Sequence, residues 1–246
     1  MSTATATTQA PVSAIEPLFA LVSPEDGLGA FKGDQVVSMA GIGWAGYEEL
    51  LKVRGDRSRP RLTYLDGDLL LMSPGHSHER DKDRFHLFVV EVARALRMPF
   101  RTAGSTTYRH REKEGGFEPD LSFYFANAPA VRNKQEINLE VDPAPDLAIE
   151  VVDSHSARAA IEVSRRLGVP EAWVCDEKGL TFRVLDETGR YIKSPGSRIF
   201  PLLTAEEIVD WVRRPEGDED SDLEWLDALN RWIRETLVPR ATKPAS

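Results

Sequence analysis

The pattern of hydrophobic and polar positions predicts short strands separated by a few amphipathic helices. Residues 79–97 have apolar side chains at helical spacing and charged ones on the opposite face, so we expect a helix packed on the core. Residues 62–65 and 69–72 are apolar runs on either side of Asp66-Gly67, a dipeptide that favours the tight turn of a hairpin. Residues 145–152 form a nearly unbroken apolar strand that contains one carboxylate.

Other segments follow the same rules. Gly115-Gly116 is predicted to turn the chain, and Gly168 to end a helix over 156–167 in a left-handed cap. Thr204 to Glu207 is typical of a capped helix start, with the helix ending near Arg213. Further helices are predicted at 47–51 and 223–237, and further strands at 100–110, 121–125, 171–176, 180–185 and 190–193.

These elements divide the chain into three parts. Residues 1–40 are predicted to be a partly disordered tail, because residues 1–15 have almost no large apolar side chain to bury. Residues 41–213 contain the folded domain, and residues 214–246 contain an acidic linker, 215–222, and the last amphipathic helix.

Composition narrows the class of protein. The net charge is −9 and no segment forms the basic block of a constitutive nucleic-acid binder, although a site that gathers carboxylates for a cation also adds negative charge. The single cysteine, Cys175, excludes an intrachain disulfide framework and fits a reducing interior. No signal peptide or membrane span is evident, so we expect a soluble, cytoplasmic protein.

Two carboxylates stand out as candidate chemistry. Asp120 follows Pro119 at the start of a predicted strand, and Glu150 interrupts the apolar strand 145–152. A buried ionised carboxylate is costly unless it is paired or metal-bound. A salt bridge explains either residue alone, but the two together favour a metal site. Hard oxygen ligands suit Mg²⁺ or Mn²⁺, and the implied reaction is hydrolysis of a phosphodiester.

Several separated motifs resemble the Uma-type restriction-endonuclease family of the PD-(D/E)XK nuclease superfamily. They are YLDGDLLLMSPGHSHE, GSTTYRHREKEGGFEPDLSFYFAN, INLEVDPAPDLAIEV and RRLGVPEAWVCD with its following hairpin, and together they span roughly residues 41–213. The resemblance implies an α/β (α+β) fold with a restriction-endonuclease-like core, a mixed sheet flanked by helices, here with a C-terminal helical extension. It also implies metal-dependent cleavage of DNA without an organic cofactor.

The resemblance also assigns residues. Asp120 matches the aspartate of the PD half, Glu150 matches the acid of the (D/E)XK half, and the backbone carbonyl of Val151 would be a further metal ligand. The lysine of that motif is replaced by Val152, and the alternative position in the next helix is Ala160.

Nearby residues could compensate for these departures. Arg158 is the best substitute for the missing lysine, ahead of Arg165 and Arg166, but a guanidinium can stabilise phosphate charge without acting as a base. A solvated surface arginine is the alternative reading of Arg158. Relatives often carry Glu at the position of Leu70, and Asp68 either compensates or serves as a turn residue.

The histidines and a basic strand offer weaker candidates. His78-Glu79 matches a His-Glu pair of the family, with helix capping by Glu79 as the alternative. His76 and His78 have a metal-like spacing, but imidazole is not a preferred ligand of Mg²⁺. Tyr108, Arg109 and Arg111 fit phosphate contacts or an exposed strand face equally well.

Three functions follow from these observations. The first is a metal-dependent endonuclease in which Asp120 and Glu150 hold the ion and Arg158 assists at the phosphate. The second is a catalytically degenerate nuclease fold that acts as a nucleic-acid-binding or regulatory module. The third is an interaction protein, a possible homodimer, joined through Trp225 and Trp232 of the last helix; the alternative for that helix is docking on its own core.

Overall fold

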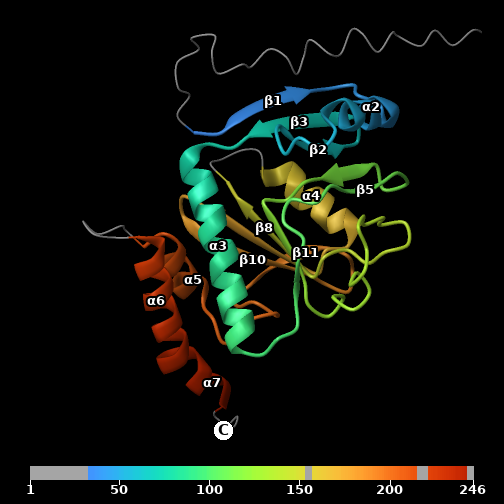
Figure 1. Ribbon diagram of the computed structural model, residues 1–246. Coiled ribbons are helices and arrows are strands. Elements are labelled where there is room, and N and C mark those ends of the chain that lie inside the picture. Colours follow the sequence, from blue (N-terminus) through green and yellow to red (C-terminus); the bar gives the residue numbers. More distant parts are fainter. Residues whose placement is uncertain (1–32, 153–156, 215–220, 243–246) are drawn as a thin grey trace, which may run out of the picture.

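The computed structural model describes residues 33–152, 157–214 and 221–242 (Figure 1). The predicted disordered stretch at 1–15 and most of the acidic segment 215–222 lie outside these residues. Two sheets and the helices around them make up the described part of the chain.

The larger sheet has six strands in the order β11-β10-β9-β8-β7-β4. Neighbouring β8 and β9 are parallel, and α4 (Ala157–Leu167) connects them, because parallel neighbours need a crossover. The other described pairs of this sheet are antiparallel, so the sheet is mixed. Its strands are β4 (Arg101–Thr102), β7 (Leu121–Tyr124), β8 (Leu147–Val151), β9 (Glu171–Asp176), β10 (Gly179–Leu185) and β11 (Tyr191–Ser194).

The smaller sheet has five antiparallel strands in the order β1-β3-β2-β6-β5. Its centre is the predicted hairpin, in which Asp66 and Gly67 have φ of 51° and 93°, as a tight turn requires. Arg166 of α4 reaches this turn with two contacts of 2.6 Å to the Asp66 carboxylate. The strands are β1 (Gln35–Met39), β2 (Arg61–Leu65), β3 (Asp68–Ser73), β5 (Tyr108–His110) and β6 (Gly115–Phe117).

The central strand β8 is buried on both faces, which explains its apolar sequence. Leu147, Ile149 and Val151 join the main hydrophobic cluster with α3 (His76–Ala95). Ala148 joins a second cluster with residues of α4. Because side chains alternate along a strand, Glu150 points to the α4 side of the sheet.

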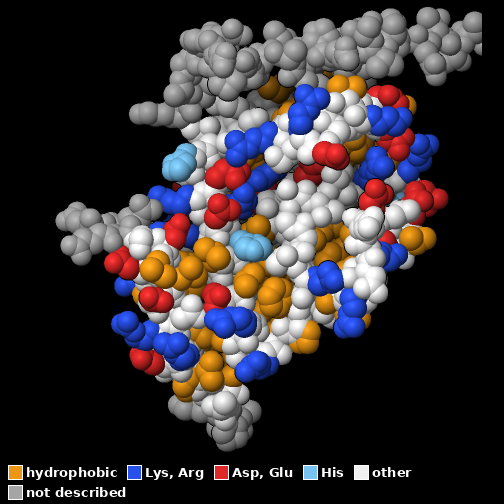
Figure 2. Space-filling model, viewed as in Figure 1, with side chains coloured by type: hydrophobic (Ala, Val, Ile, Leu, Met, Phe, Trp, Pro, Cys, Tyr) orange, Lys and Arg blue, Asp and Glu red, His pale blue; other side chains and the backbone are white. Residues whose placement is uncertain are grey.

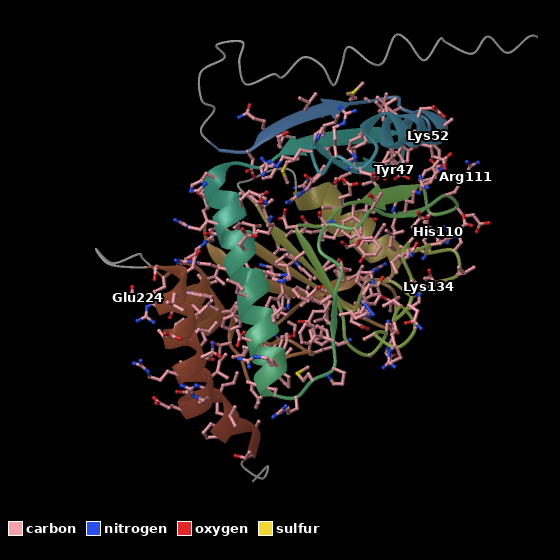
Figure 3. The ribbon with its side chains drawn as sticks, viewed as in Figure 1. Tyr47, Lys52, His110, Arg111, Lys134 and Glu224 are labelled. Atoms are coloured by element: carbon pink, nitrogen blue, oxygen red, sulfur yellow. The ribbon has the colours of Figure 1, made fainter. Side chains whose placement is uncertain are left out.

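The remaining helices enclose the ends of the molecule. Along α3 lie α5 (Ala205–Val212) and α6 (Asp222–Trp232), followed by a π-helical turn, η2 (Ile233–Leu237), and α7 (Val238–Thr242) (Figure 1). Thr204 forms the predicted capping box with Glu207 at the start of α5. At the other end, α2 (Trp44–Arg54) packs on the smaller sheet and directs Tyr47 toward it (Figure 3).

The C-terminal helices use their apolar face within the chain. Trp225, Leu229, Ile233 and Leu237 are buried in the main cluster, and Trp225 Nε1 donates a hydrogen bond of 2.9 Å to the carbonyl oxygen of Trp211. Trp232 packs on Trp211, with ring centroids 5.5 Å apart. The helix therefore docks on its own core, as the alternative to a subunit contact anticipated.

Two local predictions were wrong, and one strand was missed. Residues 100–110 form two strands, β4 and β5, that belong to different sheets, because Gly104 turns the chain with φ of 53°. Gly115 and Gly116 lie inside β6 instead of turning the chain; a Cβ at Gly116 would lie 2.8 Å from Tyr47 Cε1, so the strand needs glycine there. The missed strand is β1, which lies within residues 1–40 and pairs with β3.

The arrangement confirms the predicted α/β (α+β) class, a mixed sheet flanked by helices with a C-terminal helical extension. The view in Figure 2 shows acidic and basic side chains interspersed over one face of the molecule. Among the described residues, no helix combines the length and the apolar character needed to cross a membrane.

Candidate active site

Asp120 and Glu150 lie at the adjoining ends of β7 and β8. Leu121 faces Ile149 across the antiparallel pair, so the next step along both strands brings Asp120 and Glu150 together. The backbone N–H of Val151 donates a hydrogen bond of 2.6 Å to Asp120 Oδ2, which fixes Asp120 beside the end of β8. Both acids are buried, with 1% and 7% of their surface exposed.

Arg61 of β2 places a positive charge next to both acids. Its guanidinium forms an ion pair with Asp120 Oδ1, and its charge acts on Glu150 across the same space. A second contact, of 3.3 Å, joins Arg61 Nη2 to Glu79 Oε1 in the first turn of α3. Arg61 is thus a cation of the protein itself that pairs with Asp120 and acts on Glu150 through its charge.

Glu150 is the less satisfied of the two acids. Burial raises its pKa to about 8, although the charge of Arg61 acts in the opposite direction. Its Oε1 atom is buried and has no hydrogen-bond partner among the described residues. A buried oxygen without a partner is unfavourable and marks a place where a proton or a cation would bind.

His78 connects Asp120 to a second acid, Asp34. Its Nε2 lies 2.7 Å from Asp120 Oδ1, and its Nδ1 lies 2.9 Å from Asp34 Oδ2. Burial raises the pKa of Asp34, but the hydrogen bonds from His78 and from the N–H of Gly75 outweigh burial and leave that pKa below its usual value. The buried imidazole therefore holds Asp120 in place, while His76, two residues earlier, is exposed.

A separate buried ion pair supports the segment that leads to Asp120. Glu118 is paired with Arg54 of α2 and accepts a hydrogen bond of 2.9 Å from the N–H of Leu62. Thr107 donates to the other oxygen of this carboxylate. Glu118 thus joins α2, β2 and the residue before β5 to the residues before β7, and its oxygens are occupied by these partners.

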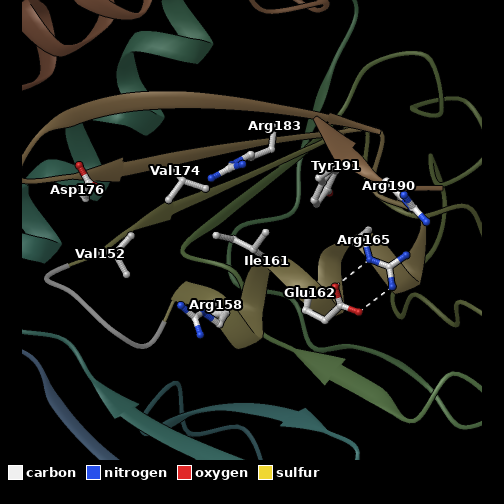
Figure 4. A pocket seen from close by; sticks show the side chains of 10 residues that line it. All are labelled: Val152, Arg158, Ile161, Glu162, Arg165, Val174, Asp176, Arg183, Arg190 and Tyr191. Atoms are coloured by element: carbon white, nitrogen blue, oxygen red, sulfur yellow. Dashed lines mark hydrogen bonds and ion pairs between the residues drawn. The ribbon is translucent and has the colours of Figure 1, made fainter. Parts of the chain in front are cut away.

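Arg158, the predicted substitute for the lysine, lies apart from the acid pair. It is exposed in the first turn of α4 and lines a pocket together with Val152 (Figure 4). No hydrogen bond or ion pair joins it to Asp120 or Glu150 in the part of the chain that the structure describes. Ala160 is buried in the second hydrophobic cluster.

The other candidate residues from the sequence also form no hydrogen bond or ion pair with Asp120 or Glu150 in the described part of the chain. Asp68 is exposed opposite Leu65, and Leu70 faces Thr63, so the strand β3 brings neither a carboxylate nor a base to the acid pair. Tyr108 is buried and bonded to Ser122, whereas Arg111 is exposed and paired with Glu48. Within the described ranges, no group of three or more His, Cys, Asp or Glu residues is arranged to hold a metal ion.

A pocket of about 330 Å³ lies beside the site, because its lining includes His78, which contacts Asp120, and Val151, which follows Glu150. Val152 lines it too, together with Asp81 and Arg213, which form an ion pair of 3.1 Å. Val152 also lines the pocket that contains Arg158, so both pockets border the residue that follows β8.

The sequence did not point to Arg61 or Asp34, and both were missed. Arg61 follows Pro60 at the start of a strand, and Asp34 lies in the predicted tail. The available signal was indirect: a buried acid needs a counter-charge, and the first residue of a strand that enters the core is a place to look for one.

Comparisons with known proteins place the chain in a family. A family model described as "Uma2: Putative restriction endonuclease" matches residues 44–215, well over half of the chain. The crystal structure of "a putative nuclease belonging to DUF820" from Anabaena variabilis ATCC 29413 aligns with a TM-score of 0.48 and 17% identity, over 67% of this chain and 97% of that one.

Curated relatives match over shorter stretches. Small ribosomal subunit protein uS2 of Rhodopseudomonas palustris strain BisB5 is 35% identical over 99 residues, 38% of this chain and 27% of that protein. The same protein of strain TIE-1 is 35% identical over 139 residues, 49% of this chain and 39% of that protein. The chain thus spans well under half of the length of these relatives, and the family follows from the first match: the chain belongs to the Uma2 family, described as putative restriction endonucleases.

Proposed function

We propose that the chain is a divalent-metal-dependent endonuclease that hydrolyses phosphodiester bonds of DNA, with Asp120 and Glu150 as its metal-binding carboxylates. The observation that carries this proposal is the meeting of two buried acids at the paired ends of β7 and β8, where Glu150 Oε1 has no partner in the described structure. Membership of a family described as restriction endonucleases supports a nuclease.

The donor set suits Mg²⁺ or Mn²⁺. Magnesium is commonly bound through one or two carboxylates, with water and substrate phosphate as the other ligands, so two acids suffice. The carbonyl of Val151 is the proposed third protein ligand, because the N–H of the same residue already touches Asp120. A bound divalent cation would activate a water, neutralise charge on the phosphate oxygens and stabilise the leaving oxygen.

The chain's own residues have distinct proposed roles. His78 is a positioning residue, because it orients Asp120 through a hydrogen bond of 2.7 Å. Arg61 supplies positive charge to both acids, so a metal ion would compete with its ion pair for Asp120 Oδ1. Arg158 would stabilise phosphate charge from the wall of the adjoining pocket, since an arginine stays charged and does not act as a base.

Plasmid and linear DNA incubated with Mg²⁺, with Mn²⁺ or with EDTA test the proposal. Wild-type protein should cut with metal, and Asp120→Asn and Glu150→Gln should each lower the rate by about a hundredfold or more. Asp142→Asn is the matched control, because Asp142 pairs with Lys134 in the loop between β7 and β8. Cutting in EDTA, or unchanged rates in both site variants, would refute the proposal.

A catalytically silent nucleic-acid-binding module is the second candidate. It is favoured by Arg61, which already pairs with Asp120, and by Val152 and Ala160 at the positions of the family's lysine. Ala160 is buried in an apolar cluster, so Val152, which lines both pockets, is the better place to restore the lysine. An inactive wild type and a Val152→Lys variant that cuts with Mg²⁺ would establish this candidate over the first.

We also propose that the protein acts in the cytoplasm. The buried, unpaired Cys175 fits a reducing compartment. Fractionation of cells that express the tagged protein would test this location.

A further inference from the structure

A second pocket near the acid pair lies between α4 and the strands β9, β10 and β11 (Figure 4). Its volume is about 740 Å³. Val174 lies on its wall and pairs with Glu150 across the parallel strands β8 and β9. Burial raises the pKa of Tyr191, another wall residue, and the charge of Glu150 raises it further, which also places the pocket next to that acid.

Arginine side chains dominate the walls of this pocket. Arg158 and Arg165 come from α4, while Arg183 and Arg190 come from β10 and the turn before β11, so the cations stand on two opposite walls (Figure 4). The acids on the walls are Glu162 and Asp176. The pocket is therefore positively charged beside a site that is rich in carboxylates.

Most of this positive charge has no acidic partner in direct contact, although Asp186 is near enough for its charge to act on Arg190. Arg165 is paired with Glu162 at 2.7 Å, but the guanidinium groups of Arg158, Arg183 and Arg190 form no hydrogen bond or ion pair with any residue in the described ranges. The Nε atom of Arg183 is also buried without a partner. Arginines that face a hollow without counter-ions favour an anionic ligand there.

The layout of the cations indicates an extended ligand. Charges on two walls can follow a chain of phosphates, and the apolar residues between them, such as Val152 and Ile161, offer no hydrogen bonds that would read a base. Because Val152 also lines the pocket beside His78, a strand lying here would continue past the acid pair. Single-stranded backbone and duplex backbone present the same phosphate chemistry.

We propose that this pocket binds the phosphate backbone of the nucleic-acid strand next to the bond that is cut. This proposal rests on the proposed nuclease function, because it places the bound backbone beside the bond that the nuclease cuts. Arg183 and Arg190 are the principal contacts of the pocket with the phosphates. Their binding is sequence-independent, because phosphate contacts position a strand and leave base recognition to other groups.

Binding of fluorescein-labelled duplex and single-stranded oligonucleotides, followed by anisotropy in EDTA over a range of salt concentrations, tests the pocket without cleavage. The Arg183→Gln/Arg190→Gln variant should bind about tenfold or more weakly, and the slope of log K against log salt should fall by about 2, close to 0.9 for each lost contact. Arg231→Gln removes the same charge from an exposed position of α6 and should bind as the wild type does.

Single variants show whether weaker binding by the double variant comes from the lost charges or from misfolding. Arg190 is exposed, so Arg190→Gln leaves the core intact and should still weaken binding severalfold. Arg183→Lys keeps the charge and should retain most of the salt slope. Equal affinity and equal salt slope in wild type, Arg190→Gln and the double variant would overturn the proposal.

Pyrophosphate and a mononucleotide separate a strand from a small ligand. If either binds tightly to the wild type and not to the double variant, while oligonucleotides bind both proteins equally, the pocket takes a small phosphate compound and the proposal falls. Because the assay contains no divalent metal, an absence of nuclease activity leaves a positive binding result intact. If the double variant cleaves and binds DNA as the wild type does, the proposed role of the pocket is refuted and the proposed nuclease function stands.

Discussion

Glu150 is an acid held in a place that disfavours its charge. Burial raises its pKa to about 8, from 4.5 in the unfolded chain, so between these values the folded protein keeps a proton that the unfolded chain has released. A group that binds more protons in the folded state makes stability fall as pH rises. Wild-type protein without metal should therefore lose stability from about pH 5 to about pH 8.

Glu150→Gln should remove this loss. A neutral amide has no proton to release, so the variant should gain stability relative to wild type as pH rises, on the order of a few kcal/mol by the upper end of that range. Urea unfolding in EDTA at several pH values measures the difference. Parallel stability curves for the two proteins would contradict the expected burial of an unpaired carboxyl.

Arg61 gives a second prediction at the residue scale. Removal of one partner of a buried ion pair costs about 3–5 kcal/mol, so Arg61→Met should be strongly destabilised without metal. Because the guanidinium no longer competes for Asp120, Mg²⁺ should raise the melting temperature of this variant more than that of wild type.

Arg54→Met is the matched control for Arg61→Met. It breaks another buried ion pair, with Glu118, whose carboxylate is also bonded to Leu62 and Thr107. It should be destabilised without any added response to Mg²⁺. The same metal response in both variants would argue against metal binding at the acid pair.

The acids of the site could be predicted from sequence, but their partners could not. Glu150 stands out because a carboxylate in an apolar strand violates the local pattern. Arg61 and Asp34 do not break the pattern of the residues around them, because an arginine at the start of a strand and an aspartate before a strand are ordinary. Their importance comes from contacts between distant parts of the chain, such as the 44 positions between Asp34 and His78.

At the scale of elements, the sequence was sufficient to predict turns and helix ends whose backbone conformation depends on residues adjacent in the chain. The Asp66-Gly67 turn, the Gly168 helix end with φ of 85° and the Thr204 capping box all form as expected. The glycine pair at 115–116 was wrongly predicted to form a turn, because glycine also occurs in strands where a neighbouring side chain leaves no room for Cβ. Tyr47, which fills that space, lies nearly seventy positions earlier.

Gly116→Ala tests this account of β6. The added Cβ would meet the Tyr47 ring at 2.8 Å, so the variant should lose about 1–3 kcal/mol of unfolding free energy. Gly196→Ala is the control, because nothing lies within 4 Å of a Cβ built there. In a Tyr47→Leu background the loss should shrink; an equal loss in both backgrounds would place the strain elsewhere.

At the scale of the whole molecule, the C-terminal helices are part of the main core. Trp225→Ala removes a side chain that is 2% exposed and should lower the unfolding free energy by about 3–5 kcal/mol. Leu223→Ala, two residues earlier and 67% exposed, should change it by less than about 0.5 kcal/mol. Similar effects of the two variants in urea unfolding would show that the helix does not depend on its buried face.

The oligomeric state stays a prediction of its own. The apolar face of α6 is buried within the chain, so this face is not available to a second copy while the fold is intact. Mass in solution should therefore be the same for wild type and for Leu223→Ala. A shift in mass on changing this exposed leucine would reopen the homodimer through the last helix.

The tie between Arg166 and Asp66 reaches further than its surface position indicates. The hairpin turn that it holds belongs to the same strand pair that carries Arg61, whereas Asp120 and Glu150 belong to the other sheet. The tie is solvent-exposed, and dissolved salt weakens such pairs. Added salt should therefore weaken this link between α4 and the hairpin turn, while β2, which carries Arg61, stays held by its pairing with β3 and β6.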